Sequence, residues 1–495
     1  MHPSAMARSL LEAAGGGGGA AAVANSTGPA LMDITLGGVL ETSLTDLWLL
    51  FCGYLVFFQQ CGFALLEAGS VRQKNVRNIL LKNVIDACVA VLMWWAVGAA
   101  LEGVTECGGS AFVGKTGFFL SGDTAATPGY MSRWFFGWAF SATASTLVSG
   151  AVAERLRFRS YLCYTFLITG LVYPVAAHWV WSPDGWLSPT RRDCATGQPL
   201  TTFPGSVGLI DFSGSGVVHL LGGTAALVGA AVLGPRLGRY TSAGHLVDLP
   251  GCNPAQVALG TFILWLGWYG FNPGSTGCFY GCMPLAAKIA VNTTLGAGAG
   301  GLTTLALTVV LGAPGDVGPL LNGIIAGLVS ITGSCAVVAP WAAVVIGGLG
   351  GCFYTCSSWL LRKARIDDPL DVSAVHGCCG AWGLIAGGLF ATQAGVQEAY
   401  GRPPEGWGLF FGGGGTQLGV QLLGLVSIFA WSAALNACLF LTLRAIGWLR
   451  VPKEEEIQGL DYTQSIGGGA AFWFLRGVKA QPSDDQNLSH TSSGL

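Results

Sequence analysis

Long apolar segments separated by short polar ones dominate this chain. Each approaches or exceeds the roughly 20 residues that an α-helix needs to cross a bilayer. They begin near positions 46, 80, 133, 159, 212, 253, 284, 319, 337, 371 and 415. We therefore predict an all-α integral membrane protein with eleven transmembrane helices. Only a short uncharged stretch around Cys335 divides the pair between 319 and 361, so ten and twelve helices are the alternatives.

The composition agrees with a lipid bilayer as the surrounding solvent. The 495 residues are 52% hydrophobic and 10% charged, whereas soluble domains carry about 25% charged residues. A net charge of −2 offers no basic surface, so we exclude nucleic acid as a partner. The cysteines lie mostly in apolar segments, without the spacing of a disulfide framework or a zinc site, and the pair Cys378 and Cys379 is interpreted as packing. We expect neither a metal nor a cofactor.

The basic residues predict the orientation, because cytoplasmic loops are enriched in Lys and Arg. With the N-terminus outside, the inner side receives seventeen of the 24 basic residues: Arg72, Lys74, Arg77, Lys82, Arg155, Arg157, Arg159, Arg236, Arg239, Arg362, Lys363, Arg365, Arg444, Arg450, Lys453, Arg476 and Lys479. The outer side receives six: Arg8, Lys115, Arg133, Arg191, Arg192 and Arg402. Lys288 lies at a helix start and is not assigned to either side. We expect the N-terminus outside and the C-terminus inside, as an odd number of helices requires.

Three regions follow from this pattern. Residues 1–43 are rich in Ala and Gly, carry a glycosylation sequon at Asn25, and lack the basic start and compact apolar core of a signal peptide. We expect them to form a disordered extracellular tail. Residues 44–448 would form the transmembrane domain, and residues 449–495 a cytoplasmic tail.

Two similar segments indicate an internal repeat. VHLLGGTAAL at 218–227 and VHGCCGAWGL at 375–384 share V-H-x-x-x-G and a final Leu, and each follows an aspartate, Asp211 or Asp371. They lie on the fifth and tenth predicted helices. Because five is an odd number, the two copies enter the membrane from opposite faces, which is typical of an inverted repeat with its functional site near the midplane.

Ionisable side chains within membrane helices are rare and usually functional. A single histidine in an apolar helix is more often a packing residue, but His219 and His376 occupy repeat-related positions, which favours a paired role. The other candidates are Asp86, Glu154, His178 and Asp211. We interpret Asp211 first as a cap at the outer start of a helix, and His178 as a helix-end residue.

Several segments resemble motifs of the ammonium transporter family, specifically its plant-type branch. They are VAERLRF at 152–158, DFSGSGVVH at 211–219, GTFILWLGWYGFNPGS at 260–275 and DDPLDVSAVHGCCGAWG at 367–383, together with YPVAAHWVWSPDGW at 173–186 and LFFGGGG at 409–415. The resemblance runs from about residue 46 to 470. It implies an eleven-helix homotrimer in the plasma membrane, with one pore per subunit for ammonium, ammonia or methylammonium.

The resemblance also implies the residues of the site. An outer recruitment site would be formed by Trp181, Phe140 and Ser275, with Asp211 nearby. Phe140 and Phe271 would form a gate below it, and His219 and His376 would line the pore. An aromatic face attracts a cation by roughly 0.5–2 kcal/mol, and a serine hydroxyl accepts a hydrogen bond. From spacing alone, Trp181 is equally well an aromatic residue of the membrane interface; the resemblance favours the site.

Paired histidines suit an ammonia pore. Burial lowers the pKa of an amine by as much as about 3–5 units, so an ammonium ion in an apolar constriction loses its proton more readily. A neutral imidazole has one donor and one acceptor nitrogen, so the pair can hold ammonia in line or relay its proton, whereas potassium has no proton to lose. One residue departs from the branch: Gly137 stands where a Gln usually precedes the Trp-Ala-Phe of the third helix, which removes a hydrogen bond beside Phe140.

The segment KEEEIQGLDYTQSIGGG at 453–469 resembles the family's regulatory tail. Thr463 occupies the position of its phosphorylated threonine, which implies a kinase as a partner. The family has His-Gly-Gly just after that threonine, whereas here Gln464, Ser465 and Ile466 intervene. Without the resemblance, residues 453–495 would be interpreted as a solvated tail.

The sequence therefore predicts a transporter that moves ammonium into the cell. The alternatives are a membrane sensor that binds ammonium and signals through its tail, and an electroneutral ammonia channel. A short tail and the presence of both histidines favour transport. We do not expect an enzyme, because GGGG at 412–415 follows no strand and precedes no Lys-Ser/Thr, as a phosphate-binding loop would.

Overall fold

The computed structural model describes residues 36–104, 107–122, 126–312, 317–401 and 404–463. The chain divides into two units, residues 1–40 and residues 41–495. The described part of the first unit, residues 36–40, is helical and lies within the segment 1–43 that was expected to be a tail. Asn25 lies outside the described residues, and the following account concerns the second unit.

Helices and loops make up the described residues, which contain no strand beyond isolated backbone bridges. The order is α2 (Leu36–Ser70), η1 (Gln73–Asn75), α3 (Val76–Met93), η2 (Trp94–Gly98), α4 (Ala99–Glu102), η3 (Phe118–Leu120), α5 (Tyr130–Ala151), α6 (Phe158–Leu167), η5 (Ile168–Val172), α7 (Tyr173–Trp181), η6 (Ser215–Leu220), α8 (Leu221–Leu233), α9 (Pro254–Gly274), α10 (Met283–Val310), α11 (Val317–Thr332), α12 (Pro340–Lys363), η7 (Ser373–Cys378), α13 (Cys379–Phe390), α14 (Gln393–Tyr400), η8 (Leu409–Phe411), α15 (Thr416–Ala445), α16 (Lys453–Gln458) and α17 (Leu460–Thr463).

Eight helical segments of the described chain are long and apolar enough to cross a membrane. They are Gly38–Ser70, Gln73–Glu102, Phe158–Trp181, Ser215–Leu233, Met283–Val310, Pro340–Lys363, Ser373–Phe390 and Thr416–Ala445. The other three predicted positions also carry helices, but α11 has only 16 residues, and α5 and α9 are less apolar. On α5 the reason is a buried polar face, which contains Ser141, Thr143, Ser145, Thr146 and Ser149.

Large apolar side chains cover the outside of the helices, while hydroxyl and amide groups lie inside. Phe51 on α2, Leu302 on α10 and Val426 on α15 are more than half exposed. This inverts the pattern of a soluble protein, because lipid is as apolar as these side chains and the interior polar groups must find partners among themselves.

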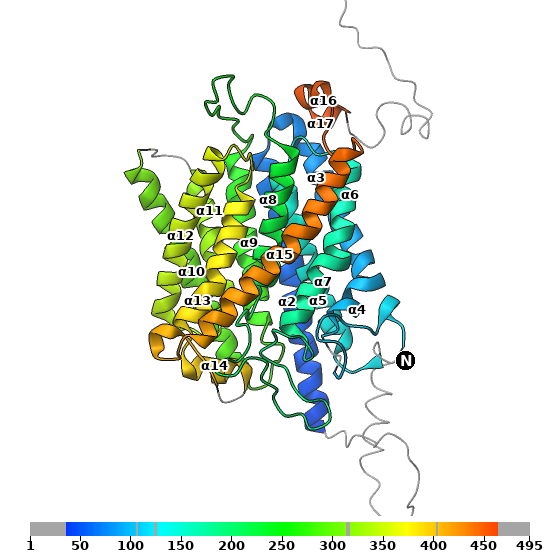
Figure 1. Ribbon diagram of the computed structural model, residues 1–495, viewed down its shortest axis with the longest axis vertical. Coiled ribbons are helices and arrows are strands. Elements are labelled where there is room, and N and C mark those ends of the chain that lie inside the picture. The colour runs from blue at the N-terminus through cyan, green and yellow to red at the C-terminus, as the bar shows by residue number, and fades with distance from the viewer. Residues whose placement is uncertain (1–35, 105–106, 123–125, 313–316, 402–403, 464–495) are drawn as a thin grey trace, which may run out of the picture. The chain divides into compact units, whose positions relative to one another are not determined.

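The helices pack closely through small residues. Helices α10, α11 and α12 contact one another extensively, and α15 crosses α8 and α13 as the oblique orange helix of Figure 1. A Cβ added to Gly300 on α10 would lie 2.5 Å from the carbonyl oxygen of Gly323 on α11. Such close backbone approach is typical of membrane helix pairs.

A buried ion network holds the loops at one end of the bundle, which we call the ion-pair end. Arg236 donates from Nε to Asp367 at 2.8 Å, its Nη1 lies 3.6 Å from Glu154, and Glu154 also accepts from Arg72. The Arg155 guanidinium, fully buried, donates to the carbonyl oxygens of residues 151, 153, 234 and 367. Burial alone would raise the pKa of Asp367, but hydrogen bonds from Arg236 and the charges of Arg155 and Arg236 lower it to about 2.

We predict that Asp367→Asn destabilises the protein, because it leaves the buried Arg236 without its counter-charge, a loss that typically costs about 3–5 kcal/mol. Thermal unfolding of the detergent-solubilised protein would show a melting temperature several degrees lower. Because the pKa of Asp367 is about 2, below the usual 3.8, its contribution should be full above pH 3.8 and be lost as the pH falls through 2.

The matched control is Asp248→Asn, whose carboxylate is 90% exposed and lies 3.8 Å from Arg239. We expect little change, since exposed ion pairs contribute little. Equal melting temperatures for the two variants would contradict a stabilising role for the network.

Candidate functional site

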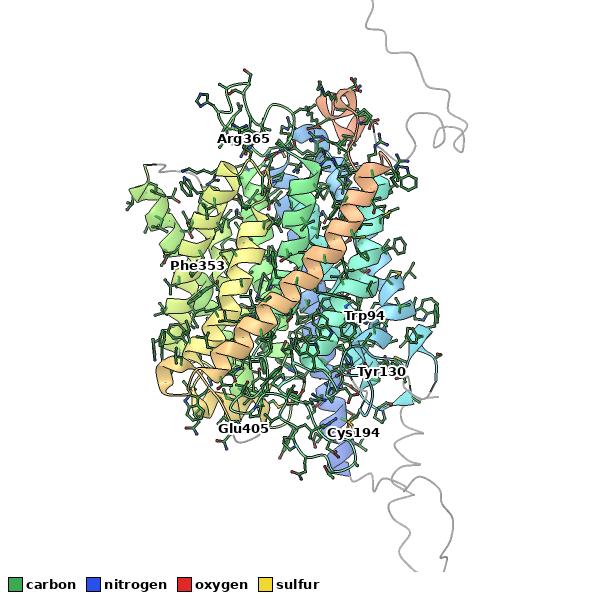
Figure 2. The ribbon with its side chains drawn as sticks, viewed as in Figure 1. Trp94, Tyr130, Cys194, Phe353, Arg365 and Glu405 are labelled. Atoms are coloured by element: carbon green, nitrogen blue, oxygen red, sulfur yellow. A yellow bond between two sulfur atoms is a disulfide. The ribbon has the colours of Figure 1, made fainter. Side chains whose placement is uncertain are left out.

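A cavity of about 370 Å³ opens among the loops at the other end of the bundle, which we call the cavity end. In Figure 2, Cys194 and Glu405 lie at the cavity end, and Arg365 lies at the ion-pair end. The cavity lining brings together four residues that the sequence assigned to an outer site: Phe140, Trp181, Asp211 and Ser275. They come from α5, the end of α7, the loop before η6 and the end of α9.

Hydrogen bonds fix the orientation of Trp181 and Ser275. The Trp181 Nε1 donates to the carbonyl oxygen of Asp211 at 2.9 Å, and its ring meets Phe140 edge-on at 5.9 Å between centroids. Ser275 donates from Oγ to the carbonyl oxygen of Phe271 at 2.9 Å. The hydroxyl oxygen of Ser275 therefore keeps its lone pairs as acceptors beside the cavity.

Two stacked phenylalanines form the floor of the cavity. Phe140 and Phe271 lie face to face, with centroids 3.9 Å apart and planes 19° from parallel. Both are buried, and only Phe140 lines the cavity. The Phe271 ring lies 5.6 Å from the imidazole of His219, so the stack separates the cavity from the histidines.

His219 and His376 lie side by side beneath the stack. Their Nδ1 atoms are 3.2 Å apart and the rings are nearly parallel, within 28°. Trp268 also stacks on His219, with 5.3 Å between the ring centroids. The His219 Nε2 is buried and has no hydrogen-bond partner among the described residues, so it is free for a small polar molecule.

Local backbone features bring the two histidines together. Each lies in a π-helical turn, η6 or η7, at the start of an otherwise α-helical segment, and such turns are frequent at functional sites. Gly223 follows His219 by one turn, and a Cβ there would lie 2.1 Å from the backbone nitrogen of Gly377. Only glycine therefore allows the two helices to approach this closely.

An aspartate caps each π-helical turn. Asp211 accepts from the backbone N–H of Gly216 at 3.0 Å, five residues later. In the second segment the equivalent contact, again five residues ahead, joins Asp368 to the N–H of Ser373 at 2.7 Å. The match of Asp371 to Asp211 was therefore wrong, because Asp371 accepts from the side chains of Tyr354 and Ser358 instead.

A second, much smaller cavity of about 20 Å³ lies beyond His376. Its lining includes Phe63, Leu147 and Val375 in addition to His376, and it is mainly apolar. The large cavity, the phenylalanine stack, the paired histidines and this small cavity therefore follow one another within the unit.

The remaining ionisable candidates have structural contacts. Asp86 accepts from the hydroxyls of Ser145, Thr146 and Thr165 at 2.6–2.8 Å. Glu154 belongs to the ion network at the other end of the bundle. The ring nitrogens of His178 lie 2.8 Å and 2.7 Å from the carbonyl oxygens of residues 102 and 110, as expected for a helix-end residue outside the pore.

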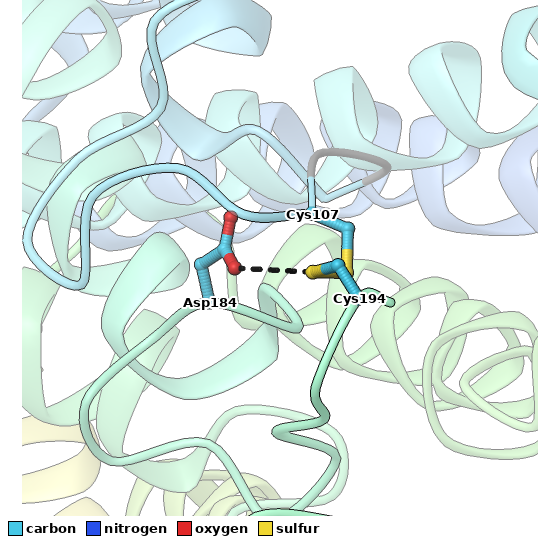
Figure 3. Close-up of side chains that lie close together, drawn as sticks. All are labelled: Cys107, Asp184 and Cys194. Carbon is cyan, nitrogen blue, oxygen red and sulfur yellow. Dashed lines mark hydrogen bonds between the residues drawn. A yellow bond between two sulfur atoms is a disulfide. The ribbon is translucent and has the colours of Figure 1, made fainter. Parts of the chain in front are cut away.

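Disulfides were missed by the sequence reasoning. Cys107 and Cys194 join two cavity-end loops, and Cys278 and Cys282 close a short loop after α9. Figure 3 shows Asp184 beside the first disulfide, where it also accepts from the N–H groups of residues 108 and 109. The two sulfurs are bonded to each other, so they are not thiolate ligands for a metal. The available signal was that both pairs lie in loops on one predicted side of the membrane.

The described part of the C-terminal tail is docked on the ion-pair end. Asp461 accepts from the backbone N–H groups of Arg77 and Asn78, and the N–H of Leu460 donates to the side chain of Asn75 at 3.0 Å. Thr463 is half-buried and donates to the carbonyl oxygen of residue 459. Residues 453–463 therefore do not form a solvated tail, while Gln464, Ser465 and Ile466 lie outside the described residues.

Known proteins share both sequence and fold with this chain. The family model described as "Ammonium Transporter Family" matches residues 47–469. Ammonium transporter 1 member 1 of Arabidopsis thaliana is 42% identical over 83% of this chain and 82% of its own length, and ammonium transporter Amt2 of Archaeoglobus fulgidus is 43% identical over 86% and 87%.

Solved structures agree with these relatives. A structure described as a sensor Amt protein has a TM-score of 0.75 and 32% identity, and covers 86% of this chain and 99% of its own. Mep2 of Candida albicans has a TM-score of 0.72 and 29% identity, with 83% and 87% covered. The chain belongs to the ammonium transporter family.

Proposed function

We propose that the protein takes up ammonium at the cavity end, removes its proton and conducts ammonia past His219 and His376. The observation that carries this proposal is the continuous order of cavity, phenylalanine stack, paired imidazoles and small inner cavity. Such an order matches the steps that the chemistry requires: partial dehydration, loss of a proton, and passage of a small neutral molecule.

The cavity supplies the groups for recruitment. Trp181 and Phe140 offer aromatic faces, each worth roughly 0.5–2 kcal/mol to a cation, and the Ser275 oxygen offers lone pairs. Asp211 adds negative charge to the cavity. Its Oδ2 accepts from the N–H groups at the start of η6, and its Oδ1 is buried beside Gly333 without a hydrogen-bond partner among the described residues.

The histidine region favours the neutral substrate. The imidazoles are buried among Phe271 and Trp268, and an ammonium ion that enters such surroundings loses the hydration that stabilises its charge. The unpaired Nε2 of His219 and the Nδ1–Nδ1 contact give a line of hydrogen-bonding atoms for ammonia. A potassium ion cannot donate a hydrogen bond to these nitrogen atoms and has no proton to lose, so it is rejected.

We further propose eleven membrane spans, with the N-terminus and the cavity end outside and the C-terminus inside. Helices at all eleven predicted positions support this count. Disulfides at the cavity end support an outer location, because they persist in oxidising surroundings. The network at the ion-pair end supports the inner location of the basic loops. Assembly as a homotrimer in the plasma membrane rests on the family resemblance.

The docked tail supports a regulatory role for Thr463. Thr463 is the last residue of α17, the turn in which Asp461 accepts from backbone N–H groups at the start of α3. A phosphate on Thr463 would add a charge of about −1.5 to −2 next to that carboxylate. Repulsion would then release or shift the tail, and a kinase would control the loops at the inner end of the pore.

A sensor and an electroneutral ammonia channel are the alternatives. The docked tail is the observation that favours a sensing role. Currents and radiolabelled methylammonium uptake, measured together in oocytes that express the chain, separate the three. Substrate-dependent current supports electrogenic transport, uptake without current supports the channel, and neither, with confirmed surface expression, supports the sensor.

We predict that Trp181→Leu weakens apparent affinity for methylammonium by roughly 2- to 30-fold, because one aromatic face is lost. The concentration dependence of uptake measures this. Trp341→Leu is the control, since that ring is 56% exposed on α12 and outside the cavity. Identical uptake curves for Trp181→Leu and wild type would show that Trp181 is an aromatic residue of the membrane interface and not part of the recruitment site.

We predict that His219→Ala with His376→Ala either stops ammonium flux or admits potassium, since the hydrogen-bonding line is removed. Fluxes of ammonium and potassium should be measured side by side in each single variant and in the double variant. Exposed His245→Ala controls for loss of an imidazole elsewhere. Wild-type flux and potassium rejection in the double variant would show that both histidines are packing residues.

We predict that Thr463→Asp strongly reduces transport at normal surface level, because it adds a negative charge to the docked turn, two residues after Asp461. Thr463→Asn, which has the same shape without the charge, should keep most activity. Full uptake by Thr463→Asp would remove Thr463 from the regulatory role.

A further inference from the structure

We propose that Glu102, which the sequence did not single out, is a direct ligand of the ammonium ion in the outer cavity. The inference rests on the proposed transport function and adds a carboxylate to the recruitment site. Glu102 is the last residue of α4 and lines the same cavity as Phe140, Trp181 and Ser275.

The Glu102 carboxylate is buried without a partner. The residue is only 6% exposed, yet its side chain makes no hydrogen bond or ion pair with any residue that the structure describes. Arg133 and Arg192 also line the cavity, but neither places a nitrogen within 4.0 Å of this carboxylate. A buried carboxylate is costly unless something pairs with it, so a cation in the cavity supplies the missing partner.

Gly137 makes room for this carboxylate beside the phenylalanine floor. A Cβ on Gly137 would lie 3.3 Å from Glu102 Oε2 and 2.7 Å from the Trp94 ring. Gly137 precedes Phe140 by nearly one helical turn, so the oxygen lies just outward of the aromatic stack. The side chain of a Gln at this position would collide with Trp94. With Gly at position 137, the polar group beside Phe140 is therefore the carboxylate of Glu102, from another helix, instead of a Gln amide.

The segment that carries Trp181 also fixes the backbone around Glu102. His178 Nδ1 lies 2.8 Å from the carbonyl oxygen of Glu102, and Ser182 donates to the carbonyl oxygen of Gly103 at 3.1 Å. The carboxylate and the indole are therefore held in one framework. The C-terminal end of the helix at Glu102 adds partial negative charge on the same side.

The neighbouring polar groups suit a cation with several N–H donors. The buried hydroxyl of Tyr173 lines the cavity and has no hydrogen-bond partner among the described residues. Glu102, Tyr173 and Ser275 together offer acceptor oxygens, while Phe140 and Trp181 offer aromatic faces. Ammonium and small primary ammonium ions such as methylammonium match this set. A carboxylate attracts any small cation, so Glu102 should set affinity, whereas rejection of potassium is decided deeper in the pore.

The test is radiolabelled methylammonium uptake at several concentrations in oocytes, with surface protein quantified. Glu102→Gln keeps the shape and removes the charge, so we expect the KM to rise about tenfold, as loss of a charge-assisted hydrogen bond implies. The maximal rate should change less than about twofold, and potassium should stay excluded. Glu405→Gln is the matched control, because this exposed carboxylate at the same end binds Thr201 and does not line the cavity.

Each outcome decides the question. Wild-type uptake with an unchanged KM in Glu102→Gln, or a fall in maximal rate alone, would overturn the role of Glu102 and leave the transport function intact. A wild-type chain that reaches the surface and takes up nothing would overturn the transport function and this inference with it. If Glu102→Gln fails to reach the surface, Glu102→Asp retracts the charge by one methylene; a severalfold higher KM supports the ligand role, and an unchanged KM overturns it.

Discussion

The close backbone approach of Gly223 to Gly377 is the constraint on which the pairing of His219 and His376 depends. A single Cβ at Gly223 would come within 2.1 Å of the neighbouring backbone, and any separation that relieved it would pull the two imidazoles apart. The π-helical turns and their aspartate caps act on the same geometry, since Asp211 and Asp368 hold the first N–H groups of η6 and η7. The geometry of the histidine pair is thus set by backbone positions as much as by the side chains themselves.

Polarity is distributed differently in the two ends of the unit. At the ion-pair end, the buried charge of Arg236 is paired with the carboxylates of Asp367 and Glu154. The cavity end instead leaves acceptor groups unpaired, such as the Glu102 carboxylate and the Tyr173 hydroxyl. Paired charges stabilise the ion-pair end, whereas in the proposed function a cation completes the unpaired acceptors of the cavity end. The described part of the tail contacts the ion-pair end, so the proposed regulation would act from the end opposite to the proposed recruitment site.

Helix positions and the histidine pair were predictable, because apolar length and repeated motifs are local features of the sequence. The equivalent of Asp211 was not found correctly, since Asp371 is nearer to His376 in the chain while Asp368 makes the capping contact. Glu102 was missed because its position beside the phenylalanine stack depends on the missing side chain of Gly137, which lies on another helix. Both failures concern contacts between segments, which periodicity and spacing do not contain.

The Cys107–Cys194 disulfide has a consequence for biogenesis. Its sulfurs are separated by 87 residues, and two helical passages, α5 and the segment α6 to α7, lie between them. If both passages cross the membrane, as proposed, the two cysteines lie on the same side. If only one of them crossed, the cysteines would face opposite compartments and could not form the bond. Under the proposed topology, the disulfide therefore excludes chains in which only one of these two passages has been inserted.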